Sequence, residues 1–209
     1  MLLELVLIAI VFLGIVILGS SRLRTIIHLF ALQSFILSAT PLLIYPGVHA
    51  LVMMTAVLIL KVLVMPRFLF WAIRHVSIRR EARPIIGYGK TLVFGGLLVG
   101  AAFFLSSKLE LPSKEVSNLL VPASFSVIMI GFLLLVSRLK AITQVIGYLI
   151  MENGIFLFAL LLLDRTPLLV EMGIFLDIFV AVLVMGIVIN HINEEYDDTN
   201  TLHLTTLRD

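Results

Sequence analysis

Residues 142–163, ITQVIGYLIMENGIFLFALLLL, decide the fold because they form a long apolar run whose only charged side chain is Glu152. A helix needs roughly 20 predominantly apolar residues to cross the hydrocarbon core of a bilayer. Hydrocarbon offers no water to unpaired backbone N–H and C=O groups, so such a run crosses as a helix. The stretch therefore predicts a transmembrane helix with a carboxylate near its middle.

Six further apolar segments accompany this one. The 209 residues are 61% hydrophobic and 13% charged, whereas soluble globular domains are about 45–50% apolar and about 25% charged. With a mean hydropathy of +1.17, this composition excludes an ordinary cytosolic domain. We expect an all-α, polytopic integral membrane bundle of about seven transmembrane helices. The expected segments are Leu2 to Leu18, Ile26 to Tyr45, Val48 to Met65, Thr91 to Ser106, Leu119 to Val136, Ile142 to Leu163 and Leu168 to Asn190.

Lysine and arginine are unevenly distributed between the two sides of this bundle. Positive residues favour the cytoplasmic side of a membrane, and the alternate connections hold ten on one side and three on the other. The sequence thus predicts an N-terminus outside and a C-terminus in the cytoplasm. The ten are Arg22, Arg24, Arg74, Arg79, Arg80, Arg83, Lys90, Arg138, Lys140 and Arg208, and the three are Lys108, Lys114 and Arg165.

Two local patterns concern packing at the membrane surface and between helices. The predicted cytoplasmic loop, residues 67–90, begins with aromatic and basic side chains, which is typical of interfacial helices. It reads as an amphipathic helix on the inner leaflet, as a docking surface for a partner subunit, or as both. A single GxxxG spacing from Gly96 to Gly100 favours close packing of its helix.

Three ionisable residues lie well inside the apolar segments: Lys61, Glu152 and Asp177. Each costs about 2.5–3.5 kcal/mol at a helix centre on insertion scales, so such residues mark functional sites. If the last two segments are antiparallel helices, Glu152 and Asp177 differ in depth by roughly 3 Å. Lys61 is expected nearer the cytoplasmic end of its span. Glu171 lies close to the start of the last segment, where a helix N-terminus favours an acidic side chain.

These charges predict an intramembrane proton relay. Gln144, Tyr148 and Glu152 follow at i, i+4 and i+8, which places a polar stripe along one helix face. Lys61 can pair with either carboxylate and modulate its proton affinity. The alternative is that the charges form structural ion pairs that fasten helices together.

The sequence excludes several other kinds of chemistry. There is no cysteine, so the chain holds no disulfide, thiolate metal site or cysteine-ligated iron–sulfur cluster. It has no phosphate-binding glycine loop, nucleophile elbow or clustered Ser/His/Asp, and its histidines lack metal-ligand spacing. We expect a non-catalytic chain. The net charge is +2. In a membrane protein basic loops mainly fix orientation, so we expect no nucleic-acid partner.

Several ordered motifs resemble the hydrogenase-4 component E family. Members are membrane subunits of energy-converting [NiFe] hydrogenases, including formate hydrogenlyase complexes, in prokaryotic cytoplasmic (inner) membranes. The matching motifs are Gly147-Tyr148-Leu149-Ile150-Met151-Glu152-Asn153-Gly154, Pro167-Leu168-Leu169-Val170-Glu171-Met172-Gly173-Ile174, Asp177 with Ala181-Val182-Leu183-Val184-Met185, Lys61-Val62-Leu63-Val64-Met65-Pro66 and Leu204-Thr205-Thr206-Leu207-Arg208.

The resemblance implies a relation to respiratory complex I. The last three helices are similar to the K subunit of complex I and the C subunit of Mrp antiporters, and Asp177 matches the last-helix glutamate of the K subunit. The middle-helix carboxylate of that subunit falls at Leu149, one helical turn from Glu152. The resemblance implies that this chain holds no cofactor. It implies that the nickel–iron centre and the iron–sulfur clusters lie in partner subunits.

Together these observations predict a membrane-arm subunit that contributes Glu152, Asp177, Lys61 and Glu171 to a proton-translocation path. Its expected regions are 1–118, four helices with the basic loop, and 119–209, three K-like helices with an acidic cytoplasmic tail. Expected partners are antiporter-like and quinone-module-like membrane subunits, peripheral hydrogenase subunits and the lipid bilayer. A purely structural subunit and a free-standing small ion transporter are the alternatives.

Overall fold

The computed structural model describes residues 1–75, 85–108, 117–162, 179–180, 182 and 185–186. Within these ranges every regular element is a helix, as the composition predicts. Six helices are long and apolar enough to cross a membrane: Leu2–Gly19, Leu23–Ile44, Val48–Arg74, Tyr88–Lys108, Leu120–Ser137 and Ala141–Ala159. They correspond to the first six predicted segments. The seventh, Leu168 to Asn190, lies almost entirely outside the described residues.

The labelled elements subdivide these spans. The first is α1, the second is α2 followed by the short α3, and the third is α4, the π-helical turn η1 and α5 in one continuous run. The bounds are α1 Leu2–Gly19, α2 Leu23–Ser38, α3 Thr40–Ile44, α4 Val48–Val57, η1 Leu58–Val64, α5 Met65–His75, α6 Tyr88–Lys108, α7 Leu120–Ser137, α8 Ala141–Ala159 and the 3₁₀ turn η3 Leu160–Leu162.

The third span is longer than its hydrophobic segment predicts. The sequence places a loop from residue 67, but the helix continues to His75. Pro66 does not end it, because the preceding turn is π-helical, with Met65 N–H donating to the carbonyl of Leu60 five residues back. This wider turn accommodates a residue that lacks an N–H and clashes with the carbonyl four residues before it. α6 likewise begins inside the predicted loop, at Tyr88.

α5 has the amphipathic character that its sequence predicts. Leu69, Ala72 and Ile73 are buried in the bundle, whereas Arg67 and Arg74 are exposed. The 27 residues from Val48 to Arg74 span about 40 Å as a helix, which exceeds the roughly 30 Å of a hydrocarbon core. A helix of this length can extend beyond the hydrocarbon core at either end.

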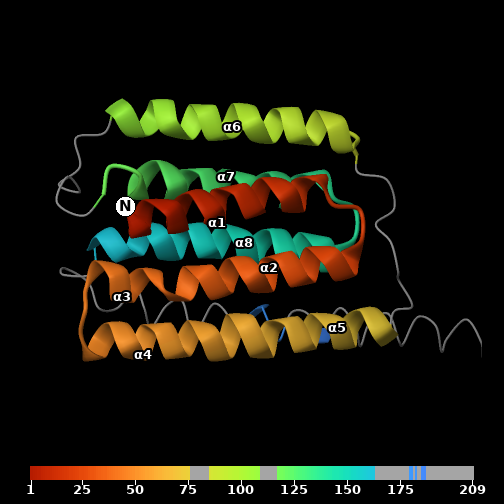
Figure 1. Ribbon diagram of the computed structural model, residues 1–209. Helices are drawn as coiled ribbons and strands as arrows, with labels where there is room; N and C mark the ends of the chain where they lie inside the picture. Colours follow the sequence, from red (N-terminus) through yellow and green to blue (C-terminus); the bar gives the residue numbers. More distant parts are fainter. Residues whose placement is uncertain (76–84, 109–116, 163–178, 181, 183–184, 187–209) are drawn as a thin grey trace, which may run out of the picture.

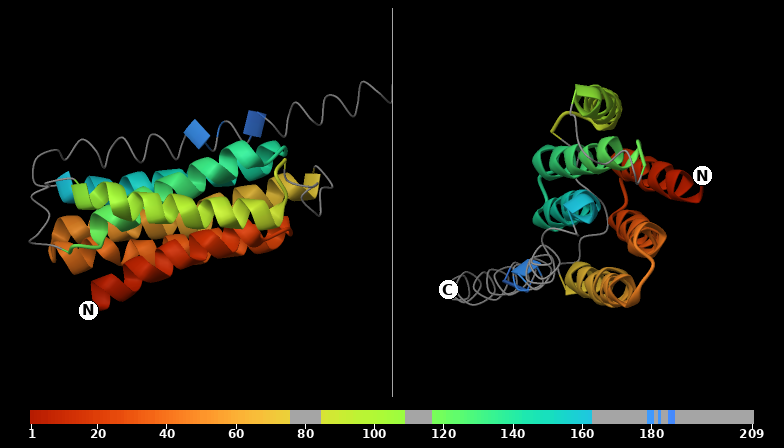
Figure 2. Two further views of the ribbon diagram at one scale, coloured as in Figure 1. Left: turned by 90° about the horizontal axis from the view of Figure 1, so that it is seen from above. Right: turned by 90° about the vertical axis from the view of Figure 1, so that its left-hand side faces the viewer.

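Four helices form the centre of the bundle and two lie on its flanks. In Figure 1, α1, α2, α7 and α8 lie between α6 on one side and the α4–α5 helix on the other. The view along the bundle in Figure 2 shows α6 and α4–α5 at opposite ends of the group. α6 packs on α7 and α1, and the third span packs mainly on α2. Large apolar side chains such as Leu97 and Phe104 on α6 are exposed, as expected of a face that meets lipid or another subunit.

α7 and α8 are the most closely packed pair of helices. A Cβ placed on Gly131 of α7 would lie 2.3 Å from the backbone nitrogen of Met151, and one on Gly147 of α8 would lie 2.6 Å from that of Leu135. A Cβ placed on Gly154 of α8 would likewise lie 2.6 Å from the backbone nitrogen of Ile128. Only glycine allows two backbones to approach this closely. This contact holds α8, which carries Glu152, at a fixed depth beside α7.

The GxxxG spacing of α6 does not make the close contact that its pattern favours. A Cβ on Gly96 or Gly100 would meet nothing within 4 Å among the described parts of the chain. Gly95 is the glycine of α6 that faces the bundle, where its Cβ would lie 2.5 Å from Leu18 Cδ1. The spacing therefore lies on the outer face of α6, away from α7 and α1.

Candidate functional site

A buried ion pair joins the third and sixth spans. Lys61 Nζ lies 2.9 Å from Glu152 Oε1, and the two side chains are only 3% and 4% exposed. Lys61 comes from the π-helical turn η1 and Glu152 from α8. The sequence allowed Lys61 to pair with either of two carboxylates; the structure shows its contact with Glu152, and Asp177 lies outside the described residues. π-helical turns are rare and often occur at functional sites.

Lys61 lies in a helix that is longer than its hydrophobic segment predicted. The sequence placed it towards the cytoplasmic end of a span that ended at Met65. The observed span runs from Val48 to Arg74, so thirteen residues separate Lys61 from either end. Lys61 therefore lies at the middle of its helix, and so does its partner Glu152 within Ala141–Ala159.

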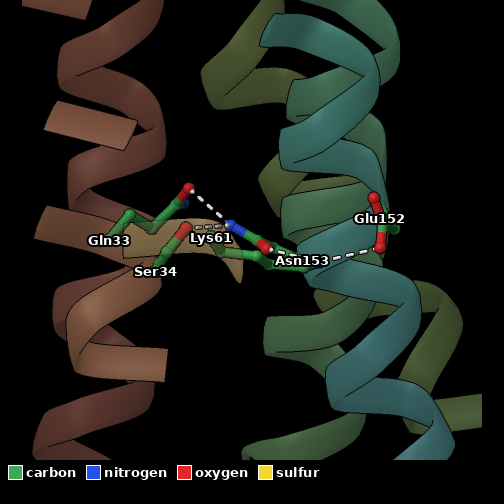
Figure 3. Close-up of polar contacts among 5 residues, drawn as sticks. All are labelled: Gln33, Ser34, Lys61, Glu152 and Asn153. Atoms are coloured by element: carbon green, nitrogen blue, oxygen red, sulfur yellow. Dashed lines mark hydrogen bonds and ion pairs between the residues drawn. The ribbon is translucent and has the colours of Figure 1, made fainter. Parts of the chain in front are cut away.

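A chain of polar side chains continues from the pair towards α2 and α1 (Figure 3). Lys61 Nζ also donates to Asn153 Oδ1 at 3.1 Å. Asn153 Nδ2 donates to Ser34 Oγ at 3.2 Å and to Gln33 Oε1 at 3.5 Å. Gln33 Nε2 donates to the carbonyl of Ile10 on α1 at 3.0 Å. Every one of these side chains is buried, so the network connects four spans inside the bundle.

One oxygen of this site has no hydrogen-bond partner among the described residues. Glu152 Oε2 is buried, and no hydrogen-bond donor reaches it within the described residues. A buried oxygen without a donor is costly, and more so when it carries charge. Binding a proton at Oε2 would remove that charge. The geometry therefore leaves Glu152 with one oxygen held by Lys61 and one available for a proton.

Sequence reasoning missed Asn153, Gln33 and Ser34. Neutral polar side chains cost little to insert, so they did not stand out beside the charges. The signal was nevertheless present: Gln33 and Ser34 interrupt an otherwise apolar stretch, and Asn153 directly follows Glu152. Polar side chains inside a membrane hydrogen-bond across helices, so these three were candidates for contact with the charged residues.

The rest of the predicted polar stripe lies nearer the start of α8. Gln144 Nε2 donates to the backbone carbonyl of Arg138 at 2.9 Å. Gln144 and Tyr148 both line an open pocket of about 230 Å³, whose wall is otherwise mostly apolar and includes Leu135 and Phe179. The structure therefore places two stripe residues at a pocket and the third, Glu152, in the ion pair.

Arg138 is a third buried charge of the described residues, and the sequence counted it only as a loop residue. Its side chain is fully buried at the end of α7. One guanidinium nitrogen donates to the carbonyl of Leu18 at 2.8 Å, at the end of α1. The guanidinium also lies over the ring of Tyr88 at 4.8 Å. Arg138 thus closes one end of the bundle by joining α1, α6 and α7.

Two predicted site residues, Asp177 and Glu171, lie outside the described residues. The similar depth of Asp177 and Glu152, and the place of Glu171 near the start of the last segment, therefore remain predictions from the sequence. Across the parts of the chain that the structure describes, the carboxylates are Glu4 and Glu152. Glu4 is exposed and pairs with the N-terminal amine, so Glu152 is the buried one of the two.

Comparison with known proteins identifies two kinds of relative. The chain is 35% identical over 191 residues to the uncharacterized protein Rv0085 of Mycobacterium tuberculosis, across 90% of this chain and 87% of that protein. It is 27% identical over 183 residues to hydrogenase-4 component E of Escherichia coli K12, across 88% of this chain and 81% of that protein. The same protein of Shigella flexneri matches equally. No family model and no solved structure matches the chain.

Proposed function

The chain belongs to the family that contains this mycobacterial protein and, as a more distant member, hydrogenase-4 component E, and on that premise we propose that it is a membrane subunit of a complex I-like, energy-converting hydrogenase. The resemblance drawn from the sequence motifs is confirmed at the level of distant homology. The relatives are bacterial, and the chain has several membrane-spanning helices. A place in the cytoplasmic membrane follows from the proposal.

Within such a complex, the chain would contribute to an intramembrane proton path. The observation that carries this proposal is the buried Lys61–Glu152 pair inside the bundle, together with Glu152 Oε2, which has no hydrogen-bond partner among the described residues. Ionisable residues inside a membrane bundle are expensive and typically serve ion or proton pathways. In the proposed path Glu152 and Asp177 pass protons, Lys61 modulates their proton affinity by its charge, and Glu171 lies at the outer entrance. The pocket lined by Gln144 and Tyr148 is the proposed entry for water on this path.

The proposed orientation has the N-terminus outside and the basic end of the bundle in the cytoplasm. The ends of α1, α5 and α7 and the starts of α2, α6 and α8 share one side of the bundle. Basic residues gather there, as the positive-inside rule requires of a cytoplasmic side. The proposed division is 1–118, with the basic stretch 67–90, and a K-like region, 119–209. The basic residues of the described part on that side are Arg22, Arg24, Arg74, Lys90, Arg138 and Lys140.

The chemistry of hydrogen would take place on partner chains. This sequence has no cysteine, so the nickel–iron centre and iron–sulfur clusters are proposed to lie in peripheral hydrogenase subunits. Antiporter-like and quinone-module-like membrane subunits are the proposed neighbours in the bilayer. The exposed apolar faces of the flanking helices α6 and α4 are available for such neighbours and for lipid.

A purely structural subunit is the second candidate. The polar network joins four spans, which is what a fastening role requires. Paired buried charges that only fasten helices can be replaced by packed apolar residues at little cost in stability. A structural subunit would therefore keep coupled proton transport when Lys61 and Glu152 are replaced together, whereas a proton path would lose it.

Co-purification tests the assembly part of the proposal. A tagged chain is extracted in mild detergent, its partners are identified by mass spectrometry, and hydrogen evolution is assayed on the eluate. We expect hydrogenase subunits and hydrogen evolution in the eluate of the tagged chain and not in that of an untagged control. Purification as a stable monomer or homo-oligomer would contradict the proposal and favour a free-standing transporter.

Replacing Glu152 with glutamine tests the proton path. Glutamine keeps an oxygen that accepts from Lys61 but takes up no proton, so the complex should assemble. Proton transport per hydrogen formed, measured in liposomes with a pH-sensitive dye, should fall by about tenfold or more, since positioned proton-transfer groups contribute roughly 10²–10⁴-fold. Glu4→Gln, at an exposed carboxylate, is the matched control and should leave transport unchanged. An unaltered coupled rate in E152Q would count against a relay role.

A further inference from the structure

The amide of Asn153 can have only one orientation. Gln33 donates to a backbone carbonyl through Nε2, so its Oε1 accepts and faces the Asn153 nitrogen Nδ2. The Asn153 atom 3.1 Å from Lys61 Nζ is therefore the oxygen Oδ1. Nδ2 then faces the oxygens of Ser34 and Gln33 at 3.2 and 3.5 Å. Asn153 is fully buried, so water does not compete for either end of the amide.

Gln33 is fixed in the same way. Its Nε2 donates to the backbone carbonyl of Ile10 at 3.0 Å, and a carbonyl can only accept. Its Oε1 is therefore turned towards Asn153 Nδ2. The hydrogen bonds from Lys61 to Asn153, from Asn153 to Gln33 and from Gln33 to the backbone of α1 therefore all run in one direction. Such a row of hydrogen bonds takes one from Lys61 and offers none to it.

The two oxygens of Glu152 have different surroundings. Oε1 accepts from Lys61 at 2.9 Å, while Oε2 is buried with no donor from the described residues. A proton delivered by water would form an O–H bond at Oε2 and remove the carboxylate charge. Oε1 would then remain as the carbonyl oxygen that accepts from Lys61. Because Asn153 Oδ1 also accepts from Lys61, the ammonium keeps an oxygen partner that does not change with the protonation of Glu152.

From these contacts we infer that Asn153, oriented by Gln33 and Ser34, is a positioning residue that holds Lys61 as a fixed ammonium, and that Glu152 takes up and releases the proton of the pair at Oε2. The inference rests on the proposed proton path and assigns separate tasks to its members. Lys61 supplies a constant charge and Glu152 carries the proton. The side-chain amides of Asn153 and Gln33 prevent Lys61 from donating a proton to Glu152.

Solid-state NMR of the full chain in liposomes measures both protonation states directly. The chain has few lysines, so ¹⁵N at Nζ and ¹³C at glutamate carboxyls give signals that are assigned by their loss in Lys61→Arg and Glu152→Gln. As the pH is lowered, we expect Glu152 to change from carboxylate to carboxylic acid while Lys61 remains an ammonium throughout. A Lys61 signal that becomes a neutral amine within this range, or a Glu152 signal that stays a carboxylate, would overturn the inference.

Asn153→Leu tests the positioning role, because leucine has a similar volume and no hydrogen-bonding groups. We expect part of the Lys61 signal to shift to that of a neutral amine at the pH where Glu152 is protonated. Gln33→Leu should cause a smaller shift of the same kind, because it removes only one hydrogen bond that orients the Asn153 amide. This variant also tests the positioning role if N153L does not fold. Ser126→Ala is the matched control, since Ser126 is buried but donates within its own helix to Pro122, and it should behave as wild type. An unchanged ammonium signal in both leucine variants would exclude the positioning role.

Lys61→Arg extends the test to transport in the assembled complex. Arginine cannot be deprotonated in proteins, so a fixed cation at this position should still support proton transport, whereas Lys61→Met should lose it. Transport lost in both variants at normal levels of assembled complex would mean that Lys61 itself passes protons. The NMR experiments need only this chain, whereas co-purification tests the assembly of the complex. Either experiment can fail while the other succeeds, so failure of this inference is distinguishable from failure of the proposed function.

Discussion

Replacing Lys61 with methionine is expected to lower the free energy of unfolding by about 3–5 kcal/mol, the cost of removing one partner of a buried ion pair. Methionine fills a similar volume, so the cavity term is small. The loss arises at Glu152, whose Oε1 gives up the donor at 2.9 Å and whose Oε2 has none from the described residues. Unfolding of the purified chain by sodium dodecyl sulfate in mixed micelles, followed by circular dichroism, measures the change.

The double variant K61M/E152M separates this cost from a loss of packing. With both charges removed, no buried charge remains uncompensated, and buried pairs replaced by packed apolar residues are often neutral in stability. We expect most of the stability to return, less about 1 kcal/mol for the hydrogen bond from Lys61 to Asn153. Lys108→Met is the control, because Lys108 is exposed at the end of α6 and surface changes stay within about 0.5 kcal/mol. A double variant as unstable as K61M would mean that volume, and not charge, determines the result.

The sequence predicted which charges matter but not how they are arranged. Lys61 and Glu152 could be identified because an ionisable side chain in an apolar run carries an insertion cost of about 2.5–3.5 kcal/mol that something must offset. The contact between Lys61 and Glu152 could not be predicted, because the two residues are 91 positions apart in the sequence. Whether they meet depends on the rotational orientation of α8 relative to the third span. That rotation is set by the glycine contact of α7 with α8, whereas the sequence pointed to the glycines of α6.

Helix ends were the other feature that hydropathy could not locate. The third segment loses its apolar character after Met65, and a proline follows, so a loop was the natural expectation. The observed helix continues because the π-helical turn accommodates Pro66 and because α5 buries Leu69 and Ala72. This continuation moves Lys61 to the middle of its span. Arg138 was missed for a similar reason: a charge between two apolar segments reads as a loop residue unless its burial is known.

Replacing Gly131 with alanine is expected to destabilise the bundle by about 3 kcal/mol or more, at or above the upper end of typical overpacking costs. The new Cβ would lie 2.3 Å from the backbone nitrogen of Met151 and 2.7 Å from the carbonyl oxygen of Gly147. Neither atom can move without displacing α8, so the two helices must separate. The displacement would also carry Glu152 away from Lys61. Unfolding in mixed micelles measures the loss of stability, and the protonated fraction of Glu152 in the carboxyl NMR spectrum measures the change at the pair.

The same substitution on α6 should have the opposite sign. A Cβ on Gly96 or Gly100 meets nothing within 4 Å in the described structure, so alanine there adds no clash and gains helix propensity, by up to about 1 kcal/mol. G96A and G100A therefore control for the general effect of replacing a helical glycine. Equal destabilisation at all three positions would show that α6 packs tightly against something in the purified chain and that the contact of α7 with α8 is no closer than others. A loss confined to G131A would identify that contact as the one that sets the position of Glu152.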